Sequence, residues 1–393
     1  MISGFDLRLL PIFILAMGCA GGAGKLIGLS AVAFIIEYFS RKSKMEKNDF
    51  MKSTIVKQSC IILGVFLGMQ LIAGLFSPDM DGIREIGRYL ERMAPFFLII
   101  LFAKGNKNFL KVAFLGVCVG TLITCGFAWQ YWFIHHVRPA STVGGPNQLG
   151  AHLTLLIPML LAGTYWCQKK STKLFGILST LFAIGTLILS GSRGAGGGLM
   201  ILLVMTLVYY LVKDKCVWKK ILIISFMLLL TLGLAIVVLN SPFGQRGDYD
   251  LERTLLRQAA WAMFLDHPIV GIGYGNFNEI YRLAYISPLA REPWLDTPHN
   301  LVLRYLSEMG IVGFLGFFSL ICFQIRCLYQ IAFDKKTSKQ VFWLFYSVFI
   351  IILAMLIHGV VDTAFMDRSY NTAYWFVWGM TCYGIYLVKK QEQ

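Results

Sequence analysis

Apolar residues dominate this chain in blocks that are long enough to cross a bilayer. A transmembrane helix needs about 20 mostly apolar residues, and the chain has room for about twelve such blocks. This pattern predicts an all-α polytopic membrane protein. The first two blocks are short and are separated only by residues 21–25, so a tight or re-entrant hairpin is an alternative for them. The predicted spans cover residues 7–22, 25–40, 55–76, 90–103, 109–134, 147–166, 173–190, 194–212, 219–240, 309–332, 341–361 and 371–388.

Lysine-rich connections alternate with lysine-poor ones along the chain. Because positively charged loops of membrane proteins stay in the cytoplasm, these connections and both termini are predicted to face inward. Residues 241–308 then form one large extracytoplasmic loop with short helices, within a single integral membrane domain that covers residues 1–393. The lysine-rich connections are residues 41–52, 104–107, 169–173, 213–220, 335–339 and 389–390.

Composition excludes a soluble domain of this size. Hydrophobic residues make up 57% of the chain and charged residues 15%, and the mean hydropathy is +0.65. The net charge of +15 does not indicate nucleic acid here, because the distribution of the charges about a membrane matters more than their sum. None of the nine cysteines belongs to a cluster with zinc spacing or to a plausible disulfide framework. We therefore expect no metal and no cofactor.

The two basic residue types fall on opposite sides of the predicted topology. Only Lys25 of the 21 lysines lies outside, whereas 12 of the 15 arginines do. Arginine outside opposes the topological rule, so something on that face must favour guanidinium groups. The planar guanidinium binds phosphate oxygens in pairs and stays charged at any relevant pH. The pattern predicts a phosphate-bearing ligand on the outer face.

The first predicted outer loop carries three arginines at helical spacing. Arg84, Arg88 and Arg92 recur every four residues and form one basic stripe. The stripe faces either lipid headgroups, as in an interfacial helix, or the phosphates of a ligand. Asp79 and Asp81 resemble an Asp-x-Asp metal motif, but we interpret them as caps of the helix that follows.

A further candidate arginine lies in the glycine-rich stretch 189–198. On the predicted topology the next span presents its N-terminus outward with Arg193 at its start. Free backbone amides, the helix dipole and a guanidinium group then converge, which is the arrangement that binds anions. The turn at residues 141–150, with Gly-Gly-Pro-Asn, opens another span and is either a plain helix start or a ligand contact.

The polar loop contains a helix over residues 251–265, which His267-Pro268 ends. Arg257 and Trp261 are four residues apart and share one face of this helix. Residues 271–277 read as a turn that lets backbone amides face the site.

A histidine precedes the next span, which is predicted to begin near Gly310. His299 stands in the sequence Asp-Thr-Pro-His-Asn, from Asp296 to Asn300. Histidine takes up protons near neutral pH, so His299 is the candidate catalytic base or acceptor-positioning group. Asp296, Asn300 and Trp261 are candidate supporting residues. So are His358 and Asp362, which lie four apart near the outer end of a later span.

Taken together, these motifs resemble the O-antigen ligase and polymerase superfamily. The resemblance rests on Ser-Arg-Gly at 192–194, an arginine before a tryptophan, His-Pro, a glycine-rich turn, His-Asn, and Glu-x-Gly-x-x-Gly at 308–313. It implies a bacterial inner-membrane glycosyltransferase that moves a glycan from polyprenyl (undecaprenyl) diphosphate to a sugar hydroxyl, with inversion and on the outer face. It further implies that arginines replace the metal ion. The donor diphosphate would contact Arg193, Arg257, Arg88 and Arg84.

The resemblance leaves the acceptor open. A ligase acts on a glycolipid such as lipid A-core in lipopolysaccharide biosynthesis, whereas a polymerase of the same superfamily joins two lipid-linked glycans. We favour the ligase. A transporter of lipid-linked glycans is a more distant alternative, because few ionisable residues lie at mid-depth in the spans and the charges cluster on one side.

Overall fold

The chain folds into a bundle of helices in the computed structural model. Residues 6–40, 48–76, 82–103, 108–212, 216–219, 221, 225, 248–292, 294–295, 297–334 and 337–391 are described. Within these ranges the structure has helices and no strand, as the apolar blocks predict. The elements are η1 (Leu7–Leu9), α1 (Leu10–Ala20), α2 (Gly24–Ser40), α3 (Thr54–Phe76), α4 (Gly82–Arg92), α5 (Ala94–Phe102), α6 (Asn108–His135), α7 (Pro146–Trp166), α8 (Lys170–Ser190), α9 (Arg193–Val212), α11 (Asp248–Asp266), α12 (Phe277–Ile280), η2 (Tyr281–Tyr285), α13 (Leu301–Ala332), α14 (Lys339–Gly359), η3 (Ala364–Met366) and α15 (Arg368–Gln391).

Six of the described helices are long and apolar enough to cross a membrane by length and composition, namely α3, α6, α7, α8, α13 and α14. Two shorter apolar helices, α1 and the first part of α9, accompany them. The expected all-helical, multi-pass architecture is confirmed, while the total of about twelve spans stays a prediction. The predicted span 219–240 lies almost wholly outside the described residues.

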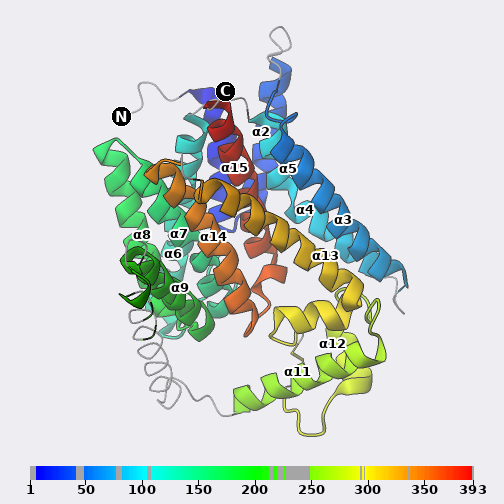
Figure 1. The fold of residues 1–393 in the computed structure, drawn as a ribbon. Coiled ribbons are helices and arrows are strands. Elements are labelled where there is room, and N and C mark those ends of the chain that lie inside the picture. Colours follow the sequence, from blue (N-terminus) through cyan, green and yellow to red (C-terminus); the bar gives the residue numbers. More distant parts are fainter. Residues whose placement is uncertain are drawn as a thin grey trace.

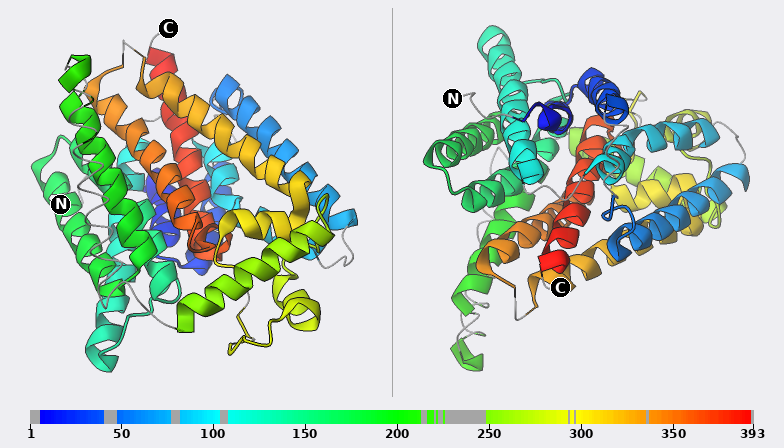
Figure 2. Two further views of the ribbon diagram at one scale, coloured as in Figure 1. Left: turned by 60° about the horizontal axis from the view of Figure 1, so that its bottom comes forward. Right: turned by 90° about the horizontal axis from the view of Figure 1, so that it is seen from above.

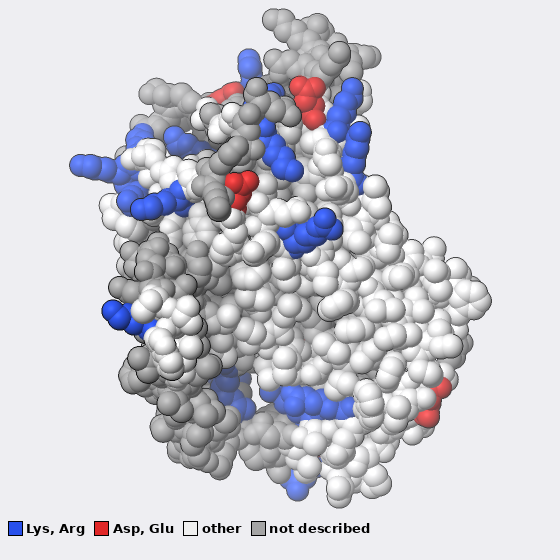
Figure 3. Space-filling view, viewed as in Figure 1, with Lys and Arg blue, Asp and Glu red and all other residues white. Residues whose placement is uncertain are grey.

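The two ends of the molecule differ in what they carry. Figure 1 shows α11 and α12 gathered at the end opposite the C-terminal end of α15. In Figure 3, Lys and Arg side chains gather toward the end with α15's C-terminus and again at the opposite end of the molecule. Which end faces the cytoplasm stays a prediction.

The predicted span 90–103 is two helices in the structure. The amphipathic α4 ends at Arg92, and α5 begins at Ala94 with Pro95 in its first turn. Proline lacks a backbone N–H and is best tolerated at the start of a helix, so it favours a new helix at this point. With nine residues, α5 is too short to cross a bilayer alone.

Helix α15 lies within the bundle (Figure 2) although it is not among the helices apolar enough to span by composition. Trp375 and Trp378 are buried. Asn371 accepts a hydrogen bond from Trp375 Nε1 at 2.9 Å and donates to Tyr89 Oη at 3.1 Å and to the Phe365 carbonyl at 2.8 Å. A helix that faces protein rather than lipid can carry such polar groups because they are paired inside the bundle.

The loop that follows α11 is attached to a kink in α13. Gly310 has φ 60° and ψ −164° inside α13, a conformation that is open almost only to glycine. A Cβ atom there would lie 2.3 Å from the Ile269 carbonyl carbon, and one at Gly271 would lie 2.4 Å from the carbonyl carbon of Glu308. The two backbones therefore touch through paired glycines, which fixes α11 across the end of the bundle.

The same contact engages two amides of the glycine-rich turn at residues 271–277. The amide of Ile272 donates to the Ser307 carbonyl at 2.9 Å, and the amide of Gly273 donates to the Glu308 carbonyl at 2.9 Å. These two amides bind α13, whereas Tyr274 and Gly275 of the same turn line a polar cavity, so an orientation of the remaining amides toward the site stays a prediction. The predicted helix 251–265 is confirmed as α11, and it ends at Asp266, directly before His267-Pro268.

Candidate active site

A polar cleft of about 420 Å³ opens where α11's following loop, α13 and the end of α14 meet the start of α7. Polar side chains dominate its wall, and they come from five separate segments of the chain. The lining residues are Arg92, Arg138, Gly145, Pro146, Asn147, Gln148, Tyr274, Gly275, Thr297, His299, Arg304, Asp362, Thr363, Met366 and Asp367.

His299 is held at the entrance to α13. It has φ 47°, a backbone conformation that is uncommon for residues other than glycine. The next residue, Asn300, caps α13 by accepting a hydrogen bond from the Leu303 amide at 2.9 Å, and its side-chain amide donates to the Val360 carbonyl at 3.1 Å. Asn300 thus ties the start of α13 to the end of α14, and this connection sets the position of His299.

Asp362 faces His299 from the segment that follows α14. The distance from His299 Nδ1 to Asp362 Oδ1 is 3.5 Å, which permits electrostatic attraction without a well-formed hydrogen bond. The backbone amide of Thr363 donates to the same carboxyl group at 2.7 Å. Burial alone would raise the pKa of Asp362, but the His299 and His358 imidazoles and the Thr363 amide outweigh it and lower that pKa. His299 Nδ1 has no hydrogen-bond partner among the described residues, and the Asp362 carboxylate is the acidic group that faces it.

His358 lies behind this pair on α14 and is buried. A Cβ atom on Gly194 would lie 2.9 Å from His358 Cδ2 and 2.6 Å from Val361 Cγ2. The absence of a side chain at Gly194 therefore lets the first turn of α9, which begins at Arg193, pack against His358. Arg193 is half-buried and does not line the cleft.

Three arginines line the cleft, each from a different part of the chain. Arg92 Nη1 donates to the Met366 carbonyl at 2.7 Å. Arg138 Nε donates to the Ser190 carbonyl at 2.8 Å, and its Nη2 donates to Asn147 Oδ1 at 2.8 Å. Arg304 Nε lies 3.3 Å from Glu308 Oε2. Guanidinium groups that are held in this way are preorganised to bind an anion.

Glu308, which partners Arg304, is completely buried in α13. Its second oxygen, Oε1, has no hydrogen-bond partner among the described residues. A buried carboxylate is stable only when it is paired, so Glu308 and Arg304 depend on each other.

Of the arginines that the sequence singled out, the described Arg88, Arg193 and Arg257 do not line the cleft. Arg88 is exposed on α4, and the side chain of Arg84 lies outside the described residues, as does Asp296. Arg257 lies on α11 with Nε buried and without a hydrogen-bond partner in the described part of the chain. Trp261, one turn further along α11, is half-exposed and packs against Phe264 with ring centroids 5.3 Å apart.

The three arginines that line the cleft were not among the arginines named from the sequence as candidate donor contacts. Arg92 belongs to the predicted arginine stripe but was not named as a candidate donor contact. Arg138 lies between two predicted spans, in a connection that is predicted to face outward like those of the other candidate arginines. Arg304 lies in the polar first turns of α13, which begins at Leu301 rather than near Gly310. The turn at 141–150 was noted, and the structure confirms that it opens α7 at Pro146 and also lines the cleft.

These features define a multi-pass helical membrane protein with a basic polar cleft at one end of its bundle. Residues 178–318 match the model of the O-antigen ligase family, and this match confirms the resemblance to the O-antigen ligase superfamily. The matched range contains Arg193, Arg257, His299 and Glu308. The family match supports a ligase-like or polymerase-like membrane function.

A relative from Haemophilus influenzae, strain KW20/Rd, is 25% identical over 262 residues. The alignment covers 61% of this chain and 64% of that protein, which is named only as an uncharacterized protein. The chain therefore spans less than two thirds of the length of this relative, and the relative assigns no activity.

Proposed function

We propose that this protein is an O-antigen ligase-like glycosyltransferase of the bacterial inner membrane. It moves a glycan from undecaprenyl diphosphate to a sugar hydroxyl of an acceptor such as lipid A-core, on the outer face of the membrane. The observation that carries the proposal is the pairing of His299 with Asp362 in a cleft that three arginines line. The family match over residues 178–318 supports the class of reaction.

The chemistry follows from these side chains. The acceptor hydroxyl oxygen attacks the anomeric carbon of the donor glycan while the bond from that carbon to the diphosphate oxygen breaks, so the configuration inverts. His299 Nε2 takes the hydroxyl proton, and Asp362 stabilises the imidazolium that forms. The polyprenyl diphosphate leaves with its charge balanced by guanidinium groups, which do the work that a metal ion does in many transferases.

Two sets of arginines take part in this proposal. Arg92, Arg138 and Arg304 line the cleft and bind the diphosphate directly. Arg193, Arg257, Arg88 and Arg84 remain proposed donor contacts on the adjoining helices α9, α11 and α4. The unpartnered Nε of Arg257 supports this role, because an unsatisfied buried donor is costly until a ligand accepts its hydrogen bond.

A deletion strain of the native host tests the reaction. Loss of a ligase leaves full-length glycans on the polyprenyl carrier and none on the acceptor. Loss of a polymerase leaves single repeat units that are still transferred, and this result would replace the ligase by the superfamily's other activity. If purified protein in proteoliposomes moves a labelled lipid-linked glycan across the bilayer without forming a glycosidic bond, the protein is a transporter and both proposals fall.

A further inference from the structure

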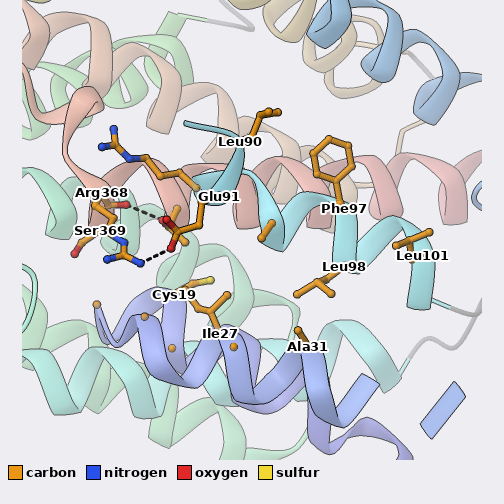
Figure 4. Close-up of a pocket in the computed structure, with 17 residues that line it drawn as sticks. Cys19, Ile27, Ala31, Leu90, Glu91, Phe97, Leu98, Leu101, Arg368 and Ser369 are labelled. Carbon is orange, nitrogen blue, oxygen red and sulfur yellow. Dashed lines mark hydrogen bonds and ion pairs between the residues drawn. The ribbon is translucent and has the colours of Figure 1, made fainter. Parts of the chain in front are cut away.

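A second cavity of about 600 Å³ lies beside the cleft, between the α1–α2 hairpin and the α4–α5 pair. Figure 4 shows its shape: Glu91, Arg368 and Ser369 lie at one end, and Ala31 and Leu101 lie at the other. Most of its wall is apolar or glycine. We call this cavity the α2–α5 groove, and its lining residues are Gly18, Cys19, Gly22, Gly24, Ile27, Gly28, Ala31, Leu90, Glu91, Arg92, Ala94, Phe97, Leu98, Leu101, Arg368, Ser369 and Thr372.

Glycines keep the groove open. A Cβ atom on Gly28 would meet no atom within 4 Å, so the space above this residue is empty. A Cβ atom on Gly24 would lie 3.7 Å from Arg368 Nη2, so Gly24 leaves room for that guanidinium group. Gly18 has the opposite role, because a side chain there would lie 2.9 Å from Leu26 Cβ and would separate α1 from α2.

The rim of the groove is suited to a membrane. On α5, the lining residues Phe97 and Leu101 are 37% and 52% exposed. Exposed apolar side chains of this size on a multi-pass protein belong in contact with lipid chains, since the bilayer core solvates them. The groove therefore opens toward hydrocarbon along its length.

Its polar end joins the cleft. Arg92 lines both spaces, and Arg368 donates to Glu91 at the same end. Arg92 and Arg368 against Glu91 leave a net positive charge, which complements a phosphate group. A lipid whose chain lay in the groove would thus have its phosphates at Arg92 and its headgroup in the cleft with His299.

We propose that the α2–α5 groove binds the isoprenoid chain of the lipid diphosphate donor, with Arg92 and Arg368 at the phosphate end. This inference rests on the proposed function. The donor suits the groove better than the acceptor does, because the basic groups needed for a leaving diphosphate lie at the groove's polar end. The volume is within the range of about 300–1,000 Å³ that is typical of small-molecule sites, which suits part of one chain.

The test fills the groove without touching the cleft. Gly28→Leu places a side chain in the empty space, and Gly64→Leu on α3 is the matched control, because a Cβ there also meets nothing within 4 Å and Gly64 does not line the groove. Transfer is measured with purified proteins, using a long-chain polyprenyl diphosphate glycan and the same glycan on a short, water-soluble isoprenoid diphosphate. We expect Gly28→Leu to raise KM at least tenfold for the long-chain donor and to leave the short-chain donor unchanged. If Gly28→Leu and Gly64→Leu have the same KM for the long-chain donor, and also the same KM for the short-chain donor, the inference is overturned.

A binding measurement covers the case in which Gly28→Leu does not fold. A photoreactive isoprenoid diphosphate is crosslinked to the wild-type protein and to Ala31→Phe, which fills the groove at its far end. We expect labelled peptides from α2 and α5, competition by unlabelled polyprenyl diphosphate but not by phosphatidylglycerol, and loss of labelling in Ala31→Phe. Labelling elsewhere, or equal competition by phosphatidylglycerol, would show that the groove holds ordinary lipid. Crosslinking at the groove without any glycosyl transfer would instead overturn the proposed function alone.

Discussion

The cleft and the α2–α5 groove meet at Arg92, yet they are built in opposite ways. The cleft is shaped by side chains that hydrogen bonds hold in place, such as Arg92 on the Met366 carbonyl and Arg138 on the Ser190 carbonyl. The groove owes its free volume to glycines, at positions 24 and 28, which have no side chain to fill it. A polar site must fix the direction of each donor and acceptor, whereas an apolar site needs only free volume.

The difference predicts how each region responds to substitution. In the cleft, a change that preserves volume or charge is expected to abolish function, because geometry carries the effect. In the groove, only a change of volume is expected to matter. The following experiments test the polar half of this comparison.

The largest effect is expected at His299. His299→Ala removes the proposed proton acceptor, so transfer should fall by about 10²–10⁴-fold, the usual contribution of general base catalysis. Initial rates with purified protein and a lipid-linked donor measure this loss, and binding of the donor should persist. Normal complementation of a deletion strain by His299→Ala would remove this residue from the mechanism.

A slightly smaller loss is expected for Arg304→Lys. Lysine keeps the charge but loses the planar fork, and its partner Glu308 is then left buried without its proper donor. If the loss follows that of an oxyanion donor, kcat falls by about 10²–10³-fold, or roughly 2.7–4 kcal/mol. Arg326→Lys on the same helix is the matched control, because Arg326 does not line the cleft. Equal rates for the two variants would move the diphosphate site elsewhere.

Substitution by lysine also tests whether the other candidate arginines contact the donor. Arg193→Lys and Arg257→Lys should lose activity to a similar degree if these residues contact the donor, while the protein still inserts and folds. Steady-state kinetics on both variants, beside Arg326→Lys, measure the effect. Near-normal transfer by both would confine the donor ligands to the cleft arginines.

A moderate effect on stability is expected for Gly310→Ala. The backbone at Gly310 is in a region that costs other residues about 1–3 kcal/mol, and the added Cβ would lie 2.3 Å from Ile269. Thermal unfolding in detergent should show a clearly lower Tm. Gly126→Ala on α6, where a Cβ meets nothing within 4 Å, serves as the control. An unchanged Tm for Gly310→Ala would show that α11 is not fixed by this contact.

The smallest effect is the pH dependence of Asp362. Its pKa in the folded protein is lowered, so its contribution to stability is complete above the ordinary aspartate pKa of about 3.9 and is lost as the pH falls through the folded value. The Tm difference between wild type and Asp362→Asn should therefore shrink as the pH falls from neutral toward that window. Asp6→Asn, at an exposed carboxylate, should show a smaller change. A Tm difference that is constant across this range would contradict the ionised Asp362.

Helix boundaries were predicted well from the sequence where a few adjacent residues determine them. The apolar blocks within the described residues became helices, His267-Pro268 ended α11, and the Gly-Gly-Pro-Asn turn at residues 141–150 opened α7 at Pro146. Proline restricts its neighbours and hydrophobic runs partition into lipid wherever they occur, so these outcomes depend on a few adjacent residues. The start of α13 was missed because its first turns are polar and their helix is stabilised by the Asn300 cap rather than by lipid.

The sequence by itself determined that this chain crosses a membrane as helices, and it placed the family's motifs at residues 192–194 and 257–313. Only the tertiary structure decided that Arg92, Arg138 and Arg304 share a cleft with His299 and that Arg92 also ends a groove. Spacing along a chain says nothing about neighbours that are hundreds of residues apart. Neighbours of this kind depend on how closely the elements approach in the folded chain. Gly194 lets α9 pack against His358, and Gly271 and Gly310 let the loop after α11 touch α13, and only the folded backbone defines these contacts.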